Sequence, residues 1–471
     1  MSIESASRKR LRWKRECGAC AGTMAEHMTA IAKPSGWIRA RRVARDVTMT
    51  TSSSGVAALC SVIALALNAR SLGPGDFGTL AVIQAYVTFI SGLATFESWQ
   101  PVIRLSARSR SRLGRAASCG IALDVSAAVV ATAVAVGGVL LFGESIGVSH
   151  QDRLLALIYS LTLLASLAGT PKGVLRLNGR YDVIAGNQLA QGAAVVVASL
   201  VLWAIEAPLI AYVAVLAAIG ALYNLALFVR LLVYARRENI KLFNPLRSRS
   251  RRRFFWTFLV MATGTSVLST LVSARRHVAL FLVAGLLGDV AAGAYSVASR
   301  LATMMSRLTG PLNQVIFPEL ARLSNEESPS RLNRLNARIT MVSACVAAGM
   351  AAGGVVLQKF IVVLAAGSAY ADASLLFAIL FAAECLGLAG MHFNPLIQVL
   401  AGTKPLLKIM ASAFIVYLPL SFVLSGWIGI PGIAWAGLIA SALVYTAMMV
   451  VSQLLLKKQI RITENIPGLT A

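Results

Sequence analysis

Long apolar runs, each of about 20 residues, alternate with short polar segments over most of this chain. A helix of that length crosses the roughly 30 Å hydrocarbon layer of a bilayer. We expect twelve such spans, at residues 47–70, 78–103, 117–142, 154–171, 183–205, 208–234, 254–286, 290–316, 339–358, 371–395, 406–428 and 431–456. The pattern therefore predicts an all-α, polytopic membrane protein.

The composition agrees with this fold class. Apolar residues make up 57% of the 471 residues, charged residues make up 13%, and the mean hydropathy is +0.73. A soluble domain carries about 25% charged residues. Because the hydrophobic content is this high, we expect most of the protein surface to contact lipid and not water.

The net charge of +25 follows from topology. Most of the 44 lysines and arginines lie in the two tails and in every second loop, whereas the other loops hold only Arg70, Arg153 and Lys359. By the positive-inside rule, both termini are predicted to be cytoplasmic and the number of spans is even. We therefore expect no nucleic-acid partner, and we expect anionic lipid headgroups to be a secondary partner of the basic loops.

The spans divide the chain into predicted segments. The basic tail 1–45 has no apolar core of a secretion signal, and we expect it to be cytoplasmic and disordered. Its Cys17 and Cys20 form one C-x-x-C without a second pair, which is typical of incidental thiols. The remaining segments are an N-terminal lobe (46–234), a basic cytoplasmic linker (235–253), a C-terminal lobe (254–456) and a cytoplasmic tail (457–471).

Two stretches of the chain repeat each other. Residues 72–81 read "LGPGDFGTLA" and residues 287–296 read "LGDVAAGAYS", which share L-G-x4-G at a separation of 215 residues. The stretches "QPVIRLSA" (100–107) and "QVIFPELA" (314–321) then end the following spans. An even number of spans separates the copies, so we predict two six-span lobes related by an axis along the membrane normal, with a binding site between them.

The stretch "SARRHVALFLVAGLLGD" (273–289) places Arg275 and Arg276 within an apolar run. Subtracting 215 sets Arg276 opposite Ser61, in the middle of the first span. Counting from a helix entry at Phe254 instead sets Arg275 about 31 Å along the helix, where it would extend to the outer headgroups. We favour the mid-span position that the repeat gives, because "HVALFLVAGLL" is too short to cross the membrane alone. The position near the outer headgroups stays open as the alternative.

Span eight carries polar residues on one helical face, at spacings of three and four. They are Ser296, Arg300, Thr303, Arg307, Gly310 and Gln314. The equivalent face of span two is uncharged and comprises Gln84, Thr88, Ser91, Thr95 and Ser98. Such faces line a cavity or pack against other helices. We predict that Gln84, Thr88, Thr303 and Gln314 are polar residues of a cavity.

Positive charge within the spans exceeds negative charge. Four arginines at mid-bilayer would cost on the order of 10 kcal/mol on insertion scales, and Asp124 and Glu384 offset few of them. Guanidinium groups form paired hydrogen bonds with phosphate and remain charged. We therefore predict a cavity for an anionic, phosphate-bearing substrate. The predicted binding residues are Arg275, Arg276, Arg300 and Arg307.

Several motifs resemble the Wzx-type flippases of bacterial lipid-linked oligosaccharides, in the multidrug/oligosaccharidyl-lipid/polysaccharide (MOP) superfamily. They are "ARSLGPGDFGTLAVIQ", "FESWQPVIRLSA", "GDVAAGAYSVASRL", "NQVIFPELARLS" and "GSAYADASLLFAIL", and the similarity covers about residues 45–455. The resemblance implies alternating access and transfer of polyprenyl-pyrophosphate-linked oligosaccharide across the inner membrane for surface polysaccharide synthesis. It also implies that the four arginines meet the pyrophosphate and that a polymerase with its chain-length machinery is a partner. One departure is that the first span has no charged residue before Arg70.

Three alternative functions would each require a feature different from those described above. A small-molecule antiporter of the same superfamily would export cationic drugs and would prefer an acidic cavity. A major-facilitator transporter would carry an acid in the loop "RLSARSRSRLGR", and a polysaccharide polymerase or ligase would need a large outer loop. No nucleotide, zinc or serine-nucleophile motif occurs, so we expect neither a cofactor nor catalysis. Asp124 and Glu384 are candidates for proton or sodium coupling, with a structural hydrogen bond as the alternative for each.

Overall fold

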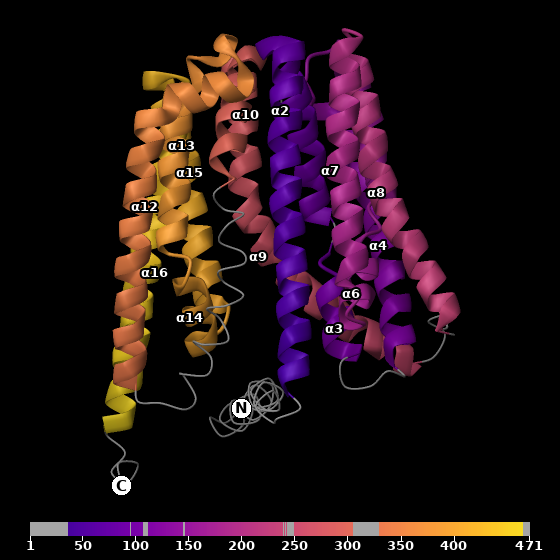
Figure 1. Ribbon diagram of the computed structural model, residues 1–471, viewed down its shortest axis with the longest axis vertical. Coiled ribbons are helices and arrows are strands. Elements are labelled where there is room, and N and C mark those ends of the chain that lie inside the picture. Colours follow the sequence, from indigo (N-terminus) through magenta and orange to yellow (C-terminus); the bar gives the residue numbers. More distant parts are fainter. Residues whose placement is uncertain are drawn as a thin grey trace, which may run out of the picture.

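The computed structural model describes residues 36–94, 96–106, 112–144, 147–238, 240, 242, 249–304 and 329–464. The described residues form helices and no strands, so the predicted all-α fold is confirmed. Figure 1 shows two helical bundles side by side, with α2 and α10 between them. We call these bundles the N-lobe and the C-lobe.

The N-lobe contains α2 (Gly36–Ala94), α3 (Trp99–Ser106), α4 (Leu113–Phe142), α5 (Arg153–Ser160), η4 (Leu161–Ala165), α6 (Gly169–Leu177), α7 (Tyr181–Ala204) and α8 (Leu209–Arg237). The C-lobe contains α9 (Arg249–Leu287), α10 (Asp289–Ala302), α12 (Pro329–Ala366), η5 (Ser368–Tyr370), α13 (Ala373–Ala389), α14 (Phe393–Ala401), α15 (Lys404–Ile428) and α16 (Ile430–Glu464). We call the end of the bundle that lies opposite the start of α2 and the end of α16 in Figure 1 the distal end.

Eight of the described helical stretches are long and apolar enough to cross a membrane. The count is below the twelve predicted spans partly because the first two spans run together in α2, which kinks at Gly73. The fourth predicted span comprises α5, η4 and α6, which together count as one of the eight, whereas α13 in the tenth is too short to count. The eighth begins with α10, and its later part, with Arg307 and Gln314, lies outside the described residues, so the count of twelve stays a prediction.

The turns between the helices carry the internal repeat. The described residues with positive φ fall into four pairs, one member in each lobe, separated by 215, 220, 223 and 223 positions. The pairs are Gly73 with Gly288, Gly147 with Gly367, Gly179 with Gly402, and Glu206 with Gly429. The first pair belongs to the two sequence stretches from which we predicted the repeat, and the other three extend the repeat over both lobes. The stretch 314–321 lies outside the described residues.

The lobes meet where α2 crosses α10, through a contact that only glycine permits. A Cβ on Gly78 would lie 1.9 Å from the carbonyl oxygen of Asp289, and one on Gly293 would lie 2.1 Å from that of Pro74. The Arg70 guanidinium also donates to a carbonyl oxygen of α12, that of Leu364, at 2.6 Å. The repeated glycines therefore let the two lobes approach backbone to backbone.

Helix α9 joins the lobes. Its first half packs into the N-lobe core through Phe258 and Ala262. Its second half, with Ala279 and Val283, belongs to the apolar core shared by both lobes. The outer faces of the bundle expose large apolar side chains, with an exposed fraction of 81% at Trp427, as expected for a surface that contacts lipid.

Candidate functional site

A cavity of about 470 Å³ lies between the lobes and is lined by residues of α2, α7, α8, α9 and α10. We call it the central cavity. Both polar faces that the sequence singled out contribute to it, α2 on one side and α10 on the other. The predicted residues on its wall are Gln84, Thr88, Arg276, Arg300 and Thr303.

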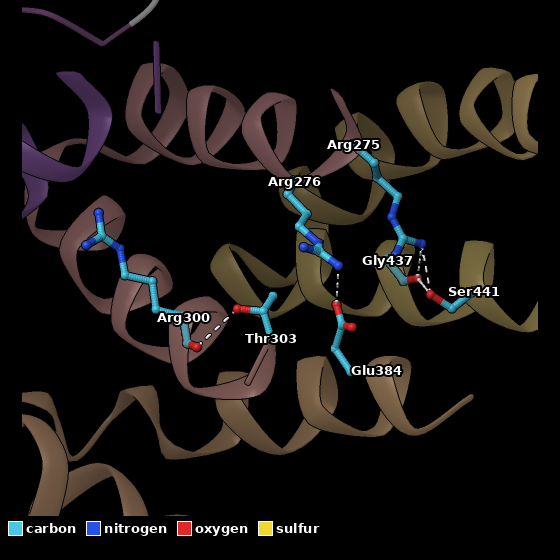
Figure 2. Close-up of polar contacts among 7 residues, drawn as sticks. All are labelled: Arg275, Arg276, Arg300, Thr303, Glu384, Gly437 and Ser441. Carbon is cyan, nitrogen blue, oxygen red and sulfur yellow. Dashed lines mark hydrogen bonds and ion pairs between the residues drawn. The ribbon is translucent and has the colours of Figure 1, made fainter. Parts of the chain in front are cut away.

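Arg300 connects the two polar faces. Its guanidinium donates a hydrogen bond of 2.7 Å to the side-chain oxygen of Gln84, which joins α10 to α2. The same group lies 5.7 Å from the ring centroid of Phe77, within range of a cation–π contact. The hydroxyl of Thr303 donates to the carbonyl oxygen of Arg300 one turn before it, at 3.1 Å (Figure 2). Arg300 is thus held at the lobe interface by a neutral acceptor, and none of the described carboxylates forms an ion pair with it.

Arg276 lies between the central cavity and a smaller cavity of about 300 Å³ within the C-lobe. One guanidinium nitrogen is 3.4 Å from a carboxylate oxygen of Glu384 on α13, and Figure 2 shows the two side chains pointing toward each other. The side chain of Arg276 remains 43% exposed, whereas that of Glu384 is 15% exposed. A single long ion pair leaves most of the donors of Arg276 available to a ligand.

Arg275 points to a different part of the C-lobe. Its guanidinium donates to the carbonyl oxygen of Gly437 at 3.2 Å and to the hydroxyl of Ser441 at 2.8 Å, both on α16. It lines the smaller cavity only. Consecutive residues of an α-helix point about 100° apart, so Arg275 and Arg276 contact different neighbours.

The predicted arginines therefore do not form a single group. Figure 2 shows the guanidinium of Arg300 apart from those of Arg275 and Arg276. Arg276 and Arg300 share the wall of the central cavity, and Arg275 does not. Arg307 lies outside the described residues. Of the described residues that line the central cavity, none is a carboxylate, so its charge is positive.

The position of Arg276 along α9 supports the depth that the repeat predicts. It lies eleven residues before the end of α9 at Leu287, about 16 Å by helical rise. Its partner Glu384 lies eleven residues after the start of α13 at Ala373, the same rise. Ser61, the repeat counterpart of Arg276, lines the same cavity. These positions are about half the thickness of a hydrocarbon layer from the distal helix ends.

A third cavity, of about 560 Å³, lies in the N-lobe. It shares Thr88, Tyr159, Gln191 and Gly220 with the central cavity, so the two are adjacent. We call it the N-lobe cavity. Sequence reasoning missed its two basic residues, because it placed Lys172 and Arg176 in a cytoplasmic loop after the fourth span.

In the structure both residues lie on α6, and their side chains line the N-lobe cavity. The spacing of four positions within "GTPKGVLRL" was the available signal, because it places both residues on one helical face. Pro171 near the start of this stretch also favours a helix there. The N-lobe therefore contributes positive charge, although its first span carries none before Arg70.

Asp124 of α4 holds the start of α6. Its carboxylate accepts a hydrogen bond of 2.8 Å from the backbone amide of Thr170, in the first turn of α6. It is only 6% exposed. A Cβ on Gly169 would lie 2.2 Å from the hydroxyl of Ser98 and 3.1 Å from this carboxylate, so glycine is needed for the close approach. These contacts support a structural role for Asp124, and its role in ion coupling stays a prediction, as does that of Glu384.

Comparisons with known proteins agree with this architecture. Over 87% of its length, the chain superimposes on 96% of a multidrug resistance MATE family transporter of the MOP superfamily in an inward-facing conformation, with a TM-score of 0.68 and 12% identity. Over 89% of its length it superimposes on 94% of the lipid II flippase MurJ in an inward closed conformation, with a TM-score of 0.68 and 13% identity. The protein is thus an α-helical membrane protein with the fold of MOP-superfamily transporters.

The sequence comparisons define the family. Residues 43–324 match the family model described as polysaccharide biosynthesis protein, which is more than half of the chain. The inner membrane protein YghQ of Escherichia coli K12 is 26% identical over 298 residues, which cover 60% of this chain and 81% of YghQ. The chain belongs to the polysaccharide biosynthesis protein family.

Proposed function

We propose that this protein is a flippase that moves polyprenyl-pyrophosphate-linked oligosaccharide units from the cytoplasmic to the outer leaflet of the bacterial inner membrane. The units would serve surface polysaccharide biosynthesis, with a polymerase and its chain-length machinery acting after transfer. Family membership and the fold shared with a lipid II flippase support a lipid-linked glycan as substrate. The distribution of basic residues supports cytoplasmic termini.

The observation that carries the proposal is the charge of the central cavity. Arg276 and Arg300 approach it from two helices, and none of the described residues on its wall is a carboxylate. The acid that pairs with Arg276, Glu384, lines the smaller cavity instead. Positive charge at this depth is costly unless a partner or water meets it. A pyrophosphate supplies several acceptor oxygens and about two negative charges, so it matches two guanidinium groups that lie apart.

The membrane potential is a sufficient driving force in this proposal. Each negative charge that moves outward gains about 2.3 kcal/mol per 100 mV. Two charges therefore gain about 4–5 kcal/mol per 100 mV if no cation accompanies them. Alternating access then requires only that the two lobes expose the central cavity to either side in turn, and coupling to a proton or sodium ion is an addition to this scheme.

A small-molecule antiporter is the second candidate, because the MATE transporter shares the fold with the same TM-score as MurJ. Export of a cationic drug would require the drug to enter a positively charged cavity. Arg276 and Arg300 oppose such a ligand by like-charge repulsion in a medium of low dielectric. The cavity therefore favours the anionic lipid.

A deletion strain that lacks a surface polysaccharide tests the proposal. We expect the wild-type gene to restore the polymer and Arg276→Ala/Arg300→Ala to fail at a matched membrane level. Arg237→Ala, at an exposed site at the end of α8, is the matched control and should restore it. If deletion of the gene changes no polysaccharide, the flippase assignment is wrong.

A further inference from the structure

Lys172 and Arg176 of α6 lie against aromatic rings on the wall of the N-lobe cavity. The ammonium nitrogen of Lys172 is 5.5 Å from the ring centroid of Tyr223. The guanidinium carbon of Arg176 is 4.5 Å from that of Trp99. A ring face attracts a cation but accepts few of its hydrogen bonds, so these contacts orient the charged groups and leave donors free.

Two carboxylates, those of Asp124 and Glu97, also line the N-lobe cavity, and Glu97 attracts the charge of Arg176 without forming an ion pair with it. Asp124 accepts the amide of Thr170 and is buried. Glu97 accepts a hydrogen bond from the side-chain amide of Gln100. Within the part of the chain that the structure describes, neither Lys172 nor Arg176 forms an ion pair with a carboxylate or a hydrogen bond through its charged group.

The N-lobe cavity adjoins the central cavity along four shared residues, so a ligand held by Arg276 and Arg300 can extend into it. We propose that Lys172 and Arg176 form a second anion-binding subsite, which takes a phosphate or a sugar carboxylate of the transported molecule. This inference rests on the proposed function. It adds to that function a binding site in the other lobe.

The chemistry favours an anion over neutral hydroxyl groups. A hydroxyl satisfies a donor but leaves the two half-buried cations without a counter-ion in direct contact, and such charge is costly away from bulk water. An oxyanion satisfies donors and charge together, through hydrogen bonds about twice as strong as neutral ones. Two sources of such an anion exist in one lipid-linked glycan: the pyrophosphate itself and an acidic sugar.

Binding to the full-length protein in nanodiscs tests the subsite. Three probes are used: geranylgeranyl pyrophosphate, the same lipid pyrophosphate carrying glucose, and the same lipid pyrophosphate carrying glucuronic acid. Lys172→Gln/Arg176→Gln removes both charges, whereas Lys172→Arg/Arg176→Lys keeps them and controls for folding. Arg180→Gln is the matched control, because Arg180 lies just beyond α6, exposed and paired with Asp182.

We expect the double glutamine variant to bind at least one probe about tenfold more weakly, and the charge-conserving variant to stay within about threefold of wild type. Weaker binding of all three probes assigns the subsite to the pyrophosphate. Weaker binding of the glucuronic acid probe alone assigns it to an acidic sugar. Unchanged binding of every probe by the double glutamine variant overturns the subsite. If Arg276→Gln still weakens binding in that case, the proposed function stands without it. If wild type binds none of the probes, both proposals fail.

Discussion

The two lobes hold their intramembrane positive charge in different ways. Arg275 and Arg276 of α9 each have a polar partner within the C-lobe, a carboxylate for Arg276 and a hydroxyl with a carbonyl for Arg275. In the N-lobe, Lys172 and Arg176 lie against aromatic rings and have no such partner in the described part of the chain. Charge that the protein itself satisfies stabilises helix packing, whereas charge left unsatisfied on a cavity wall is available to a ligand.

This difference divides the predicted arginines by role. Arg275 joins α9 to α16 and lines no part of the central cavity, so we interpret it as a packing residue. Arg276 is intermediate, because it has a partner and is also 43% exposed between two cavities. Arg300 contacts the neutral Gln84, so we propose that its charge is available to the substrate. The variants below are designed to separate these roles.

The largest effect is expected from Arg276→Gln/Arg300→Gln, which removes the positive charge of the central cavity. Two lost charge-assisted contacts are worth about 3 kcal/mol or more together, which is about a hundredfold in affinity. Binding of a polyprenyl pyrophosphate to the purified protein measures the loss. Arg276→Lys/Arg300→Lys retains the charge and should recover part of the affinity, and a full loss in that variant would mean that charge is not the property that matters.

Arg275→Met should lower stability and leave transport nearly intact. It removes two hydrogen bonds from a charged donor to α16, at a cost of about 2–3 kcal/mol. Thermal unfolding in detergent measures the first effect and polysaccharide restoration the second. Ser441→Ala removes one of the two acceptors and should cost less. Loss of transport at unchanged stability would place Arg275 in the binding site after all.

Asp124→Ala should destabilise α6 by about 1–2 kcal/mol, because the amide of Thr170 loses its acceptor. We also expect weaker anion binding, since α6 positions Lys172 and Arg176. Asp124→Asn retains an acceptor oxygen and serves as the control. Tighter binding in Asp124→Ala would show instead that the carboxylate acts by repelling the anion.

The smallest effect is expected from Glu384→Gln. Neutralising this carboxylate frees Arg276 and removes a negative charge near the cavity, so affinity for a lipid pyrophosphate should rise by about threefold. The gain is small because Arg276 is partly exposed and solvent screens the pair. If the double variant Arg276→Gln/Glu384→Gln binds the lipid pyrophosphate as tightly as Glu384→Gln does, Arg276 does not bind the substrate.

Much of the fold follows from local sequence signals. Apolar runs of membrane length predict the helices, and the G-x4-G stretches around Gly73 and Gly288 predict a repeat whose turns share the same backbone conformation. The spacings of three and four on spans two and eight predict two polar faces, and residues of both line the central cavity. They are Gln84 and Thr88 of α2 and Ser296, Arg300 and Thr303 of α10. Periodicity suffices here because one helix determines which residues share a face.

Which cavity each charged residue lines depends on contacts between helices that are far apart in the sequence, and local patterns do not predict these contacts. Nothing near Arg275 indicates that Ser441 lies beside it, 166 positions later. The sequence predicts a loop for Lys172 and Arg176, because the positive-inside rule places basic residues at the cytoplasmic surface. Their position depends on Asp124, which holds α6 against α4 from a distant part of the chain.

Transfer across a bilayer by the purified protein tests the central claim most directly. The full chain is reconstituted in liposomes with a fluorescent polyprenyl-pyrophosphate oligosaccharide, and its arrival in the opposite leaflet is followed with a membrane potential imposed. We predict transfer above that of protein-free liposomes, faster when the potential drives negative charge across and lost in Arg276→Gln/Arg300→Gln. Equal rates with and without the protein, or transfer of a cationic dye in place of the anionic lipid, would contradict the account.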